Sequence, residues 1–401
     1  MNNSTLNKIG WFLTFVLVSN STTVMPFYFG SFYYLIIIGI VLYLIFKDGF
    51  HVSYSMLMLL AVSIVSIVLN DIPSFFRPWQ RLVFFFLLTM AVGPSLVSPK
   101  AEKLKVDVFQ KLFWFFPIVI IWSLVLFVLG RGSGAGGYFQ GILVHSMIMG
   151  PVAGLTVLYC FFQFQVKKNR TIFQKVFYIL LMAASFLCLL QAGSRSAVIG
   201  TILAMLVLLF VRDEKKLSNL IKNNFWFVLA IGLTVPLWTQ YLDKLEAKNQ
   251  DDSGLNLDSR EVLWEQRLEE WKSSPIYGIG FSAVDASAEE GSTFDEESGK
   301  VETGNSWLCC LSMTGILGFL VVVFIFGSAF VSVWRLSRTV PLVSGLLLGV
   351  LTFFMAHMMA EGYIFAGGSF LNTILWLTLG VMITVGKNEE LAIELEERLT
   401  R

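Results

Sequence analysis

The sequence is poor in charge and in the residue types that bind metals or form disulfides. Charged residues make up 14% of the 401 residues, against about 25% in ordinary soluble proteins. There are three histidines and four cysteines, and the cysteines lie in apolar runs without metal-ligand spacing. The 29 basic residues nearly balance the 28 acidic ones, so net charge favours no nucleic-acid partner. We expect no metal, no cofactor and no disulfide framework.

What the sequence has in excess is apolar side chain. Hydrophobic residues make up 56% of the chain, phenylalanine alone accounts for 37 residues, and the mean hydropathy is +0.71. No soluble fold has enough interior for this composition, so lipid must replace part of the water around the protein. The predicted fold class is an all-α polytopic membrane protein.

Long apolar segments recur along the whole chain. A bilayer core about 30 Å thick needs roughly 17–25 apolar residues per helix, and about twelve segments approach that length. They are 8–25, 32–46, 54–70, 80–97, 112–129, 141–164, 174–192, 196–212, 224–241, 305–334, 340–358 and 366–386. The first segment has no small-residue cleavage site, so we interpret it as a retained helix and not as a signal peptide.

The basic residues of the short loops predict the orientation. With the N-terminus in the cytoplasm, 19 of the 29 basic residues fall on the inner side, as expected from the excess of lysine and arginine in cytoplasmic loops. One long segment, with 16 acidic and six basic residues, then lies outside. The predicted parts are an N-terminal bundle of about nine spans (1–241), this acidic outer loop (242–304), about three C-terminal spans (305–386) and a cytoplasmic tail (387–401).

The outer loop contains a predicted amphipathic helix from Ser259 to Lys272. Its large apolar residues recur at helical spacing and are Trp264, Leu268 and Trp271. At 100° per residue, Arg260 and Arg267 fall on the same side as the tryptophans. In one interpretation the helix lies on the membrane and the arginines snorkel. In the other, the helix covers a site at the membrane surface and the arginines reach into it.

Arginine is the basic residue of the short outer loops, which contain no lysine, whereas lysine predominates on the inner side. Orientation needs only positive charge, but a guanidinium binds phosphate oxygens in pairs and an ammonium does not. The outer arginines are therefore candidates for an anionic ligand, with headgroup anchoring as the alternative. They are Arg77, Arg81, Arg131, Arg195, Arg260 and Arg267.

Few groups on the outer side can move a proton. Glu302 directly precedes a span, and His145 lies near the outer end of another. His357 and Glu361 are four residues apart at an outer helix end, a spacing at which they can touch. An ionisable group at membrane depth is by default a functional-site candidate. A structural hydrogen bond is the alternative for each histidine.

Several short motifs follow one another in a recognisable order. Gly193-Ser-Arg-Ser-Ala197, which contains Ser194 and Ser196, joins two spans, and Ser259-Arg260 and Tyr277-Gly-Ile-Gly-Phe281 lie in the outer loop. Asn305-Ser-Trp-Leu308 then opens a span that contains Gly315-Ile-Leu-Gly318. In this order the motifs resemble those of the O-antigen ligase and O-antigen polymerase superfamily of bacterial inner-membrane glycosyltransferases. The resemblance covers about residues 180–320.

The resemblance implies a GT-C-like helical fold with a periplasmic active site. The distribution of basic residues and an even number of spans predict both termini in the cytoplasm. The resemblance also implies a metal-independent transfer of a glycan from undecaprenyl diphosphate, whose diphosphate Arg195 and Arg260 would hold. The implied acceptor is a hydroxyl of lipid A core, of another lipid-linked glycan or of a protein. Ligase and polymerase, in lipopolysaccharide or other surface polysaccharide biosynthesis, both remain open.

One position departs from the family pattern. The family usually has His-Asn at the start of the late span, where this chain has Gly304-Asn305, and glycine cannot accept a proton. Glu302 is the first substitute as the general base, followed by His357, His145 and Glu361.

Two other functions remain as alternatives. A polysaccharide or lipid-linked oligosaccharide transporter is the first, although the charges gather on one face and no paired half-helix repeat is evident. The second is a membrane protein whose acidic loop binds a partner.

Overall fold

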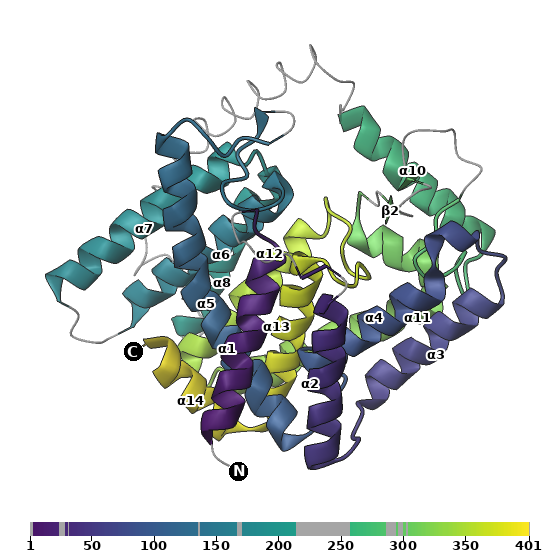
Figure 1. The fold of residues 1–401 in the computed structure, drawn as a ribbon, viewed down its shortest axis with the longest axis horizontal. Coiled ribbons are helices and arrows are strands. Elements are labelled where there is room, and N and C mark those ends of the chain that lie inside the picture. The colour runs from purple at the N-terminus through teal and green to yellow at the C-terminus, as the bar shows by residue number, and fades with distance from the viewer. Residues whose placement is uncertain are drawn as a thin grey trace. The chain divides into compact units, whose positions relative to one another are not determined.

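The computed structural model describes residues 3–23, 29–30, 32–134, 137–166, 171–213, 257–285, 294–295, 300–301 and 304–400. Helices make up most of this part of the chain (Figure 1), which confirms the predicted all-α class. The described strands are β1 (Phe294–Asp295) and β2 (Lys300–Val301), which form a small antiparallel hairpin in the segment that is predicted to be the outer loop.

A helix overlaps each predicted span that falls within the described ranges. These helices are α1 (Asn3–Ser19), α2 (Phe32–Asp48), α3 (Tyr54–Val68), α4 (Pro78–Ala91), α5 (Pro99–Val128), α6 (Ser146–Gln165), α7 (Ile172–Gln191), α8 (Arg195–Arg212), α11 (Ser306–Leu336), α12 (Pro341–His357) and α13 (Phe370–Lys387). The predicted span 224–241 lies outside the described residues.

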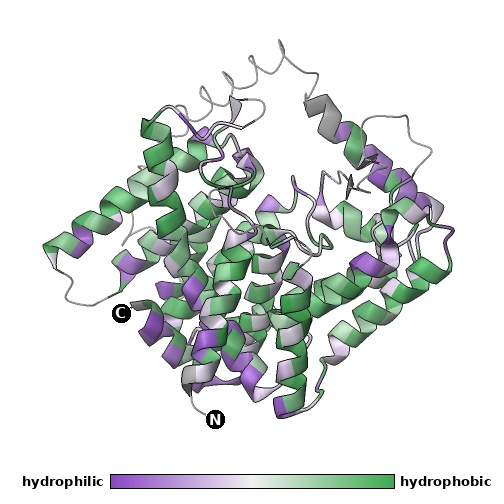
Figure 2. Ribbon diagram, viewed as in Figure 1, coloured by the Kyte–Doolittle hydropathy of each residue, from purple (hydrophilic) through white to green (hydrophobic). Residues whose placement is uncertain are grey.

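Six of these helices are long and apolar enough to cross a membrane, namely α5, α6, α7, α8, α11 and α13. Figure 2 shows their apolar character along most of their length. Most of α6 and α13 is buried by protein, whereas only 22% of the apolar window of α7 is buried, as expected of a helix that faces lipid. The chain is therefore a membrane protein with several spans, and the total of twelve stays a prediction.

The chain divides into two compact units. Unit 1 contains residues 1–112, 260–332 and 357–391, and unit 2 contains residues 113–259, 333–356 and 392–401. In unit 2, α6, α8 and α12 approach closely through glycines. A β-carbon added at Gly200 of α8 would lie 3.0 Å from the carbonyl oxygen of Phe353 in α12. Small residues allow such close helix contacts in a membrane, where packing replaces the hydrophobic effect between helices.

In unit 1, α11 is a broken helix. Gly315 has φ 63° and ψ −169°, so the helical backbone is interrupted about ten residues from its start. The loop that follows α10 fills the break: Ile316 donates its N–H to the Pro275 carbonyl (2.8 Å), and Ile279 donates to the Ser312 carbonyl (2.8 Å). The Gly315 backbone lies so close to this loop that a β-carbon there would be 2.5 Å from the Tyr277 nitrogen.

Two side chains of the α3 region complete this junction. The Ser66 hydroxyl donates to the Met313 carbonyl (2.6 Å), and the Asn70 amide donates to the Gly278 carbonyl (2.9 Å). Irregular backbone at membrane depth is tolerated only where protein or water satisfies its polar groups. The motifs around Gly278 and Gly315 therefore meet in space and satisfy one another.

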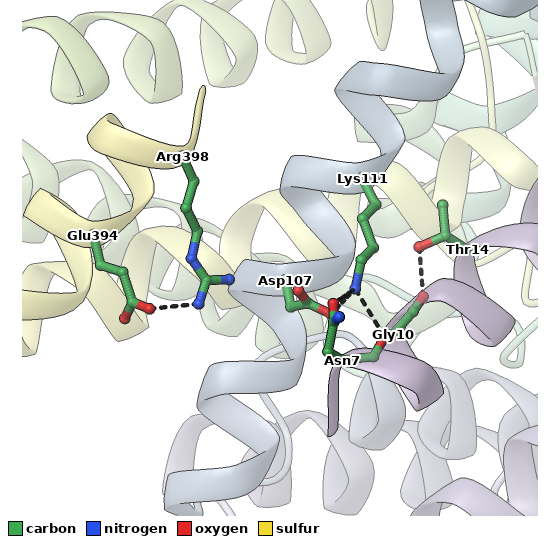
Figure 3. Close-up of polar contacts among 7 residues, drawn as sticks. All are labelled: Asn7, Gly10, Thr14, Asp107, Lys111, Glu394 and Arg398. Atoms are coloured by element: carbon green, nitrogen blue, oxygen red, sulfur yellow. Dashed lines mark hydrogen bonds and ion pairs between the residues drawn. The ribbon is translucent and has the colours of Figure 1, made fainter. Parts of the chain in front are cut away.

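The predicted inner loop before the fifth span is helical, which corrects the span boundary. α5 begins at Pro99, so Lys111 lies within the helix and is buried. Its ammonium forms an ion pair with Asp107 and donates to the Asn7 side-chain oxygen at 2.8 Å (Figure 3). Because Lys111 and Asp107 neutralise each other, the first turns of α5 can contain charged residues before its apolar part begins.

The C-terminal tail forms another helix, α14 (Glu389–Thr400). Arg398 and Glu394 form an ion pair along it (Figure 3). Leu391, Leu395 and Leu399 form its buried stripe, which is typical of an amphipathic helix packed on protein.

Candidate functional site

In unit 2, the Gly193–Ala197 motif is the turn that starts α8. Ser194 is the N-cap, and its hydroxyl accepts the Ala197 N–H (3.4 Å). Arg195 is the first residue of the helix and is half-buried. The start of α6 lies against the turn, because a β-carbon at Gly150 would be 2.7 Å from that of Ser194. Arg195 is therefore carried on a closely packed turn.

Arg131 and His145 belong to the same end of unit 2. Both side chains are exposed, and the segment between them contacts the turn, since Phe139 donates its N–H to the Gln191 carbonyl (3.1 Å). The His145 Nδ1 accepts the Met147 N–H (3.1 Å) and thereby caps α6. A neutral imidazole has one acceptor nitrogen, so His145 already uses the atom that a general base needs.

In unit 1, Arg77 and Arg81 lie one turn apart at the start of α4. Arg77 follows a short 3₁₀ turn, η1 (Ser74–Phe76), has φ 49° and is exposed. Arg81 is half-buried, and its Nη1 donates to the Ser282 hydroxyl (3.0 Å). Among the described non-glycine residues, positive φ occurs at Arg77 and Ser282. Such backbone strain is concentrated at functional sites in many proteins.

The predicted outer helix is present as α10 (Leu257–Ser273), but its buried stripe differs from the predicted one. Leu263, Arg267 and Glu270 are buried, whereas Trp264 is 37% exposed. α10 packs on protein through Leu263, near Gly304, while Leu268 and Trp271 are only partly buried. The side chain of Arg260 lies outside the described residues.

Arg267 and Glu270 form a buried ion pair in unit 1. The Arg267 side chain is 0% exposed, and its Nη2 lies 2.9 Å from Glu270 Oε1. The same carboxylate oxygen accepts the Asp285 N–H (2.8 Å). Burial lowers the pKa of Arg267 and raises that of Glu270, while their mutual attraction opposes both shifts. Sequence reasoning missed Glu270, although its i,i+3 spacing from an arginine is a usable signal.

At the start of α11, the Asn305-Ser306 motif holds the segment that follows α12. The Asn305 Oδ1 accepts the Trp307 N–H (2.9 Å), and its amide donates to the Met359 carbonyl (2.9 Å). The Ser306 hydroxyl donates to the Glu361 carbonyl (2.7 Å). The family motif thus fixes the backbone that carries Glu361.

His357 and Glu361 are not neighbours on one helix, because α12 ends at His357. The helical spacing that would let them touch is therefore absent. The His357 side chain is fully buried, and its Nδ1 shares a hydrogen bond with the Tyr363 hydroxyl (3.1 Å), which favours the structural interpretation. Glu361 is half-exposed. Glu302 lies outside the described residues.

Gly304, which stands where the family has histidine, adopts a left-handed conformation with φ 63°. A β-carbon there would lie 3.1 Å from Leu263 of α10. The local backbone is thus suited to glycine, and a histidine would be strained and crowded. Within the described ranges, no three histidine, cysteine, aspartate or glutamate side chains are grouped so as to hold a metal ion.

The family comparison covers the region in which these motifs lie. The sequence model of the O-antigen ligase family matches residues 177–323, which is less than half of the chain. This match confirms the resemblance to the O-antigen ligase and polymerase superfamily. No curated protein matches the chain. Over this region the similarity to O-antigen ligases supports, in general terms, a membrane enzyme of surface polysaccharide biosynthesis.

Proposed function

We propose that this protein transfers a glycan from undecaprenyl diphosphate to an acceptor hydroxyl at the periplasmic face of a bacterial inner membrane. The observation that carries the proposal is the O-antigen ligase match over residues 177–323 in a chain of apolar helices. A GT-C-like arrangement with both termini in the cytoplasm belongs to the same proposal. A lipid-anchored donor also accounts for arginines in loops that border the membrane.

In the proposed reaction, the acceptor oxygen attacks the anomeric carbon, and the bond from that carbon to the lipid diphosphate breaks. Negative charge then develops on the leaving diphosphate, where fixed cationic donors stabilise it. The family motifs assign this role to Arg195 and Arg260. Arg77, Arg81 and Arg131 are further candidates, whereas Arg267 is already paired with Glu270.

The acceptor hydroxyl must lose a proton, and Glu361 is the best-supported base among the described residues. Its backbone is held by Ser306, next to the position of the family histidine, and its side chain is half-exposed. His145 uses its acceptor nitrogen in a helix cap, and His357 is buried. Glu302 remains the alternative because it also lies beside that position in the sequence.

The decisive experiment is transfer by purified protein in nanodiscs with a defined undecaprenyl-diphosphate glycan. Lipid A core, a second lipid-linked glycan and a protein acceptor are offered separately, so the product distinguishes a ligase from a polymerase. Arg195→Lys should lower the rate by about 10–100-fold, because it keeps charge but loses the paired hydrogen bonds. Arg335→Lys, on the predicted cytoplasmic side, is the matched control. Near-wild-type transfer by Arg195→Lys would contradict the assignment.

The base is tested separately in the same assay. Replacing the base by glutamine should lower transfer by about 10²–10⁴-fold, the usual share of general-base catalysis. We expect this loss for Glu361→Gln, and for Glu302→Gln if that residue is the base. Glu389→Gln, an exposed change on α14, controls for the substitution itself. Full activity in both site variants rules out both carboxylates.

A lipid-linked oligosaccharide transporter is the second candidate. The observation that favours it is the break in α11 at Gly315, because many transporters bind their substrates at discontinuous helices. A fluorescent lipid-linked glycan in proteoliposomes separates the two functions. Movement between leaflets without any acceptor supports transport, whereas a new glycosidic bond supports transfer.

A further inference from the structure

The segment 278–285 of unit 1 links two of the outer arginines. Its middle is anchored by Phe281, whose buried ring lies 5.1 Å from Phe365 and 6.0 Å from Phe85, centroid to centroid. Aromatic contacts at such distances stabilise a fixed arrangement. Ser282 follows directly, buried and with φ 63°.

Ser282 faces α4. Its hydroxyl accepts a hydrogen bond from Arg81 Nη1 at 3.0 Å. A guanidinium is planar, so a fixed bond to one nitrogen limits the directions in which its other N–H groups point. The hydroxyl of Ser282 therefore helps to orient the guanidinium group of Arg81.

The end of the same segment is held by α10. The Asp285 N–H donates to Glu270 Oε1, and this oxygen also pairs with Arg267. The Arg267 and Glu270 side chains are almost completely buried. Their ion pair is therefore held in one geometry, unlike an ion pair on the surface. A left-handed non-glycine residue persists only when its surroundings hold it, and Phe281 and Glu270 hold the chain on either side of Ser282.

We propose that Ser282 and Glu270 are positioning residues for diphosphate recognition by Arg81. Ser282 orients the Arg81 guanidinium toward the phosphate oxygens of the donor. Glu270, locked by Arg267, keeps Ser282 in the conformation that makes this bond. The inference rests on the proposed function, because it assumes a diphosphate-linked donor.

The sharpest test removes the hydroxyl without disturbing the backbone. Ser282→Gly tolerates positive φ and removes the hydroxyl that accepts the hydrogen bond from Arg81 Nη1. We expect the KM for the lipid-diphosphate donor to rise about 10-fold, the usual scale for a lost hydrogen bond to a charged group, with the acceptor KM and the thermal midpoint unchanged. Ser282→Asn should restore much of the donor affinity, because asparagine accepts left-handed backbone and offers an oxygen.

Matched controls separate positioning from general loss of stability. Ser328→Ala removes a hydroxyl that bonds only within α11 and should leave the donor KM unchanged. Glu270→Gln should raise the donor KM, and Glu269→Gln, on the exposed side of α10, should not. Glu270→Gln leaves a buried arginine unpaired and lowers stability, so the conclusion depends on Ser282→Gly.

A double-mutant cycle tests whether Ser282 acts through Arg81. If it does, adding Ser282→Gly to Arg81→Lys should raise the donor KM by less than about twofold beyond the Arg81→Lys value, because interacting residues are not additive. Fully multiplicative effects would contradict the proposal.

A binding measurement distinguishes failure of this inference from failure of the proposed function. Purified protein is titrated with farnesyl diphosphate, with farnesol as the neutral control. Selective binding of the diphosphate by the unmodified protein, weakened about 10-fold in Ser282→Gly, supports the inference. Equal binding by both proteins overturns the positioning role and leaves the proposed function standing. If the unmodified protein neither binds the diphosphate nor transfers glycan, the proposed function falls, and this inference falls with it.

Discussion

The two units use glycine in different ways. In unit 2, glycines such as Gly200 sit inside continuous helices and let side chains and carbonyls of neighbouring helices approach. In unit 1, Gly315 interrupts α11, and the loop after α10 forms hydrogen bonds with the interrupted backbone. The first use needs only a small residue, whereas the second needs a backbone conformation that other residues avoid.

This difference indicates how the loop after α10, which carries Ser282, is held in place. The segment that fills the break in α11 continues into the residues that meet Arg81 and Glu270. A continuous α11 would satisfy its own backbone and offer no partners to this loop. In unit 1, the break in α11 thus positions the residues of the proposed site. In unit 2, Arg195 is positioned by a capped helix start.

The largest expected effect is for Gly315→Ala. The new β-carbon would meet the backbone of Ile276 and Tyr277, and alanine would be strained at this φ and ψ. Adding about 1–3 kcal/mol of strain to about 1–3 kcal/mol of overpacking gives a loss near 4 kcal/mol. Folded yield and thermal midpoint in detergent measure it. A stable, active Gly315→Ala protein would show that the break is not required.

A smaller loss is expected for Asn305→Ala, which disconnects α11 from the segment after α12. The change removes a helix cap and leaves the Met359 carbonyl without this donor, at a cost of about 2 kcal/mol. Transfer should also fall, because Glu361 is carried by the released segment. Asn388→Ala, which removes the exposed cap of α14, is the control and should cost about 1 kcal/mol or less. Equal losses in the two variants would contradict the special role of Asn305.

Much of the fold follows from the sequence. The apolar runs predict the helices well, because length and hydropathy are local properties. The outer helix α10 is also predicted from its periodicity. Its buried stripe is not, because the prediction assumed a lipid surface, and the structure packs Leu263, Arg267 and Glu270 against protein.

The features that escaped prediction depend on residues far apart in the chain. The break at Gly315 is stable only with Pro275 and Ile279 as partners, and the role of Ser282 depends on Arg81, 201 positions away. The bonds that Asn305 and Ser306 make to the segment after α12 also join positions more than 50 residues apart. Single-sequence patterns report local preference, and tertiary contacts decide these positions.

Gly200→Ala tests the milder use of glycine in unit 2. Its β-carbon would lie 3.0 Å from the Phe353 carbonyl oxygen, so α8 and α12 must separate slightly. Overpacking costs about 1–3 kcal/mol, and the higher helix propensity of alanine returns about 1 kcal/mol. We expect a net loss of about 1 kcal/mol, measured as a modest fall in thermal midpoint with transfer retained. A loss as large as that of Gly315→Ala would remove the distinction between the two units.

The smallest effect, of opposite sign, is expected for Gly327→Ala. Gly327 lies in the same helix as Gly315, but it is exposed and a β-carbon there meets no described atom within 4 Å. Alanine favours a helix interior over glycine by up to about 1 kcal/mol, and the added methyl group lies on the exposed side of α11. The thermal midpoint should therefore stay the same or rise slightly, with unchanged transfer. Comparison with Gly315→Ala then shows whether the loss of stability comes from replacing any glycine of α11 or from the particular conformation at Gly315. A clear loss of stability at Gly327 would mean that α11 tolerates no added methyl group, and the conformation of Gly315 would then not explain its sensitivity.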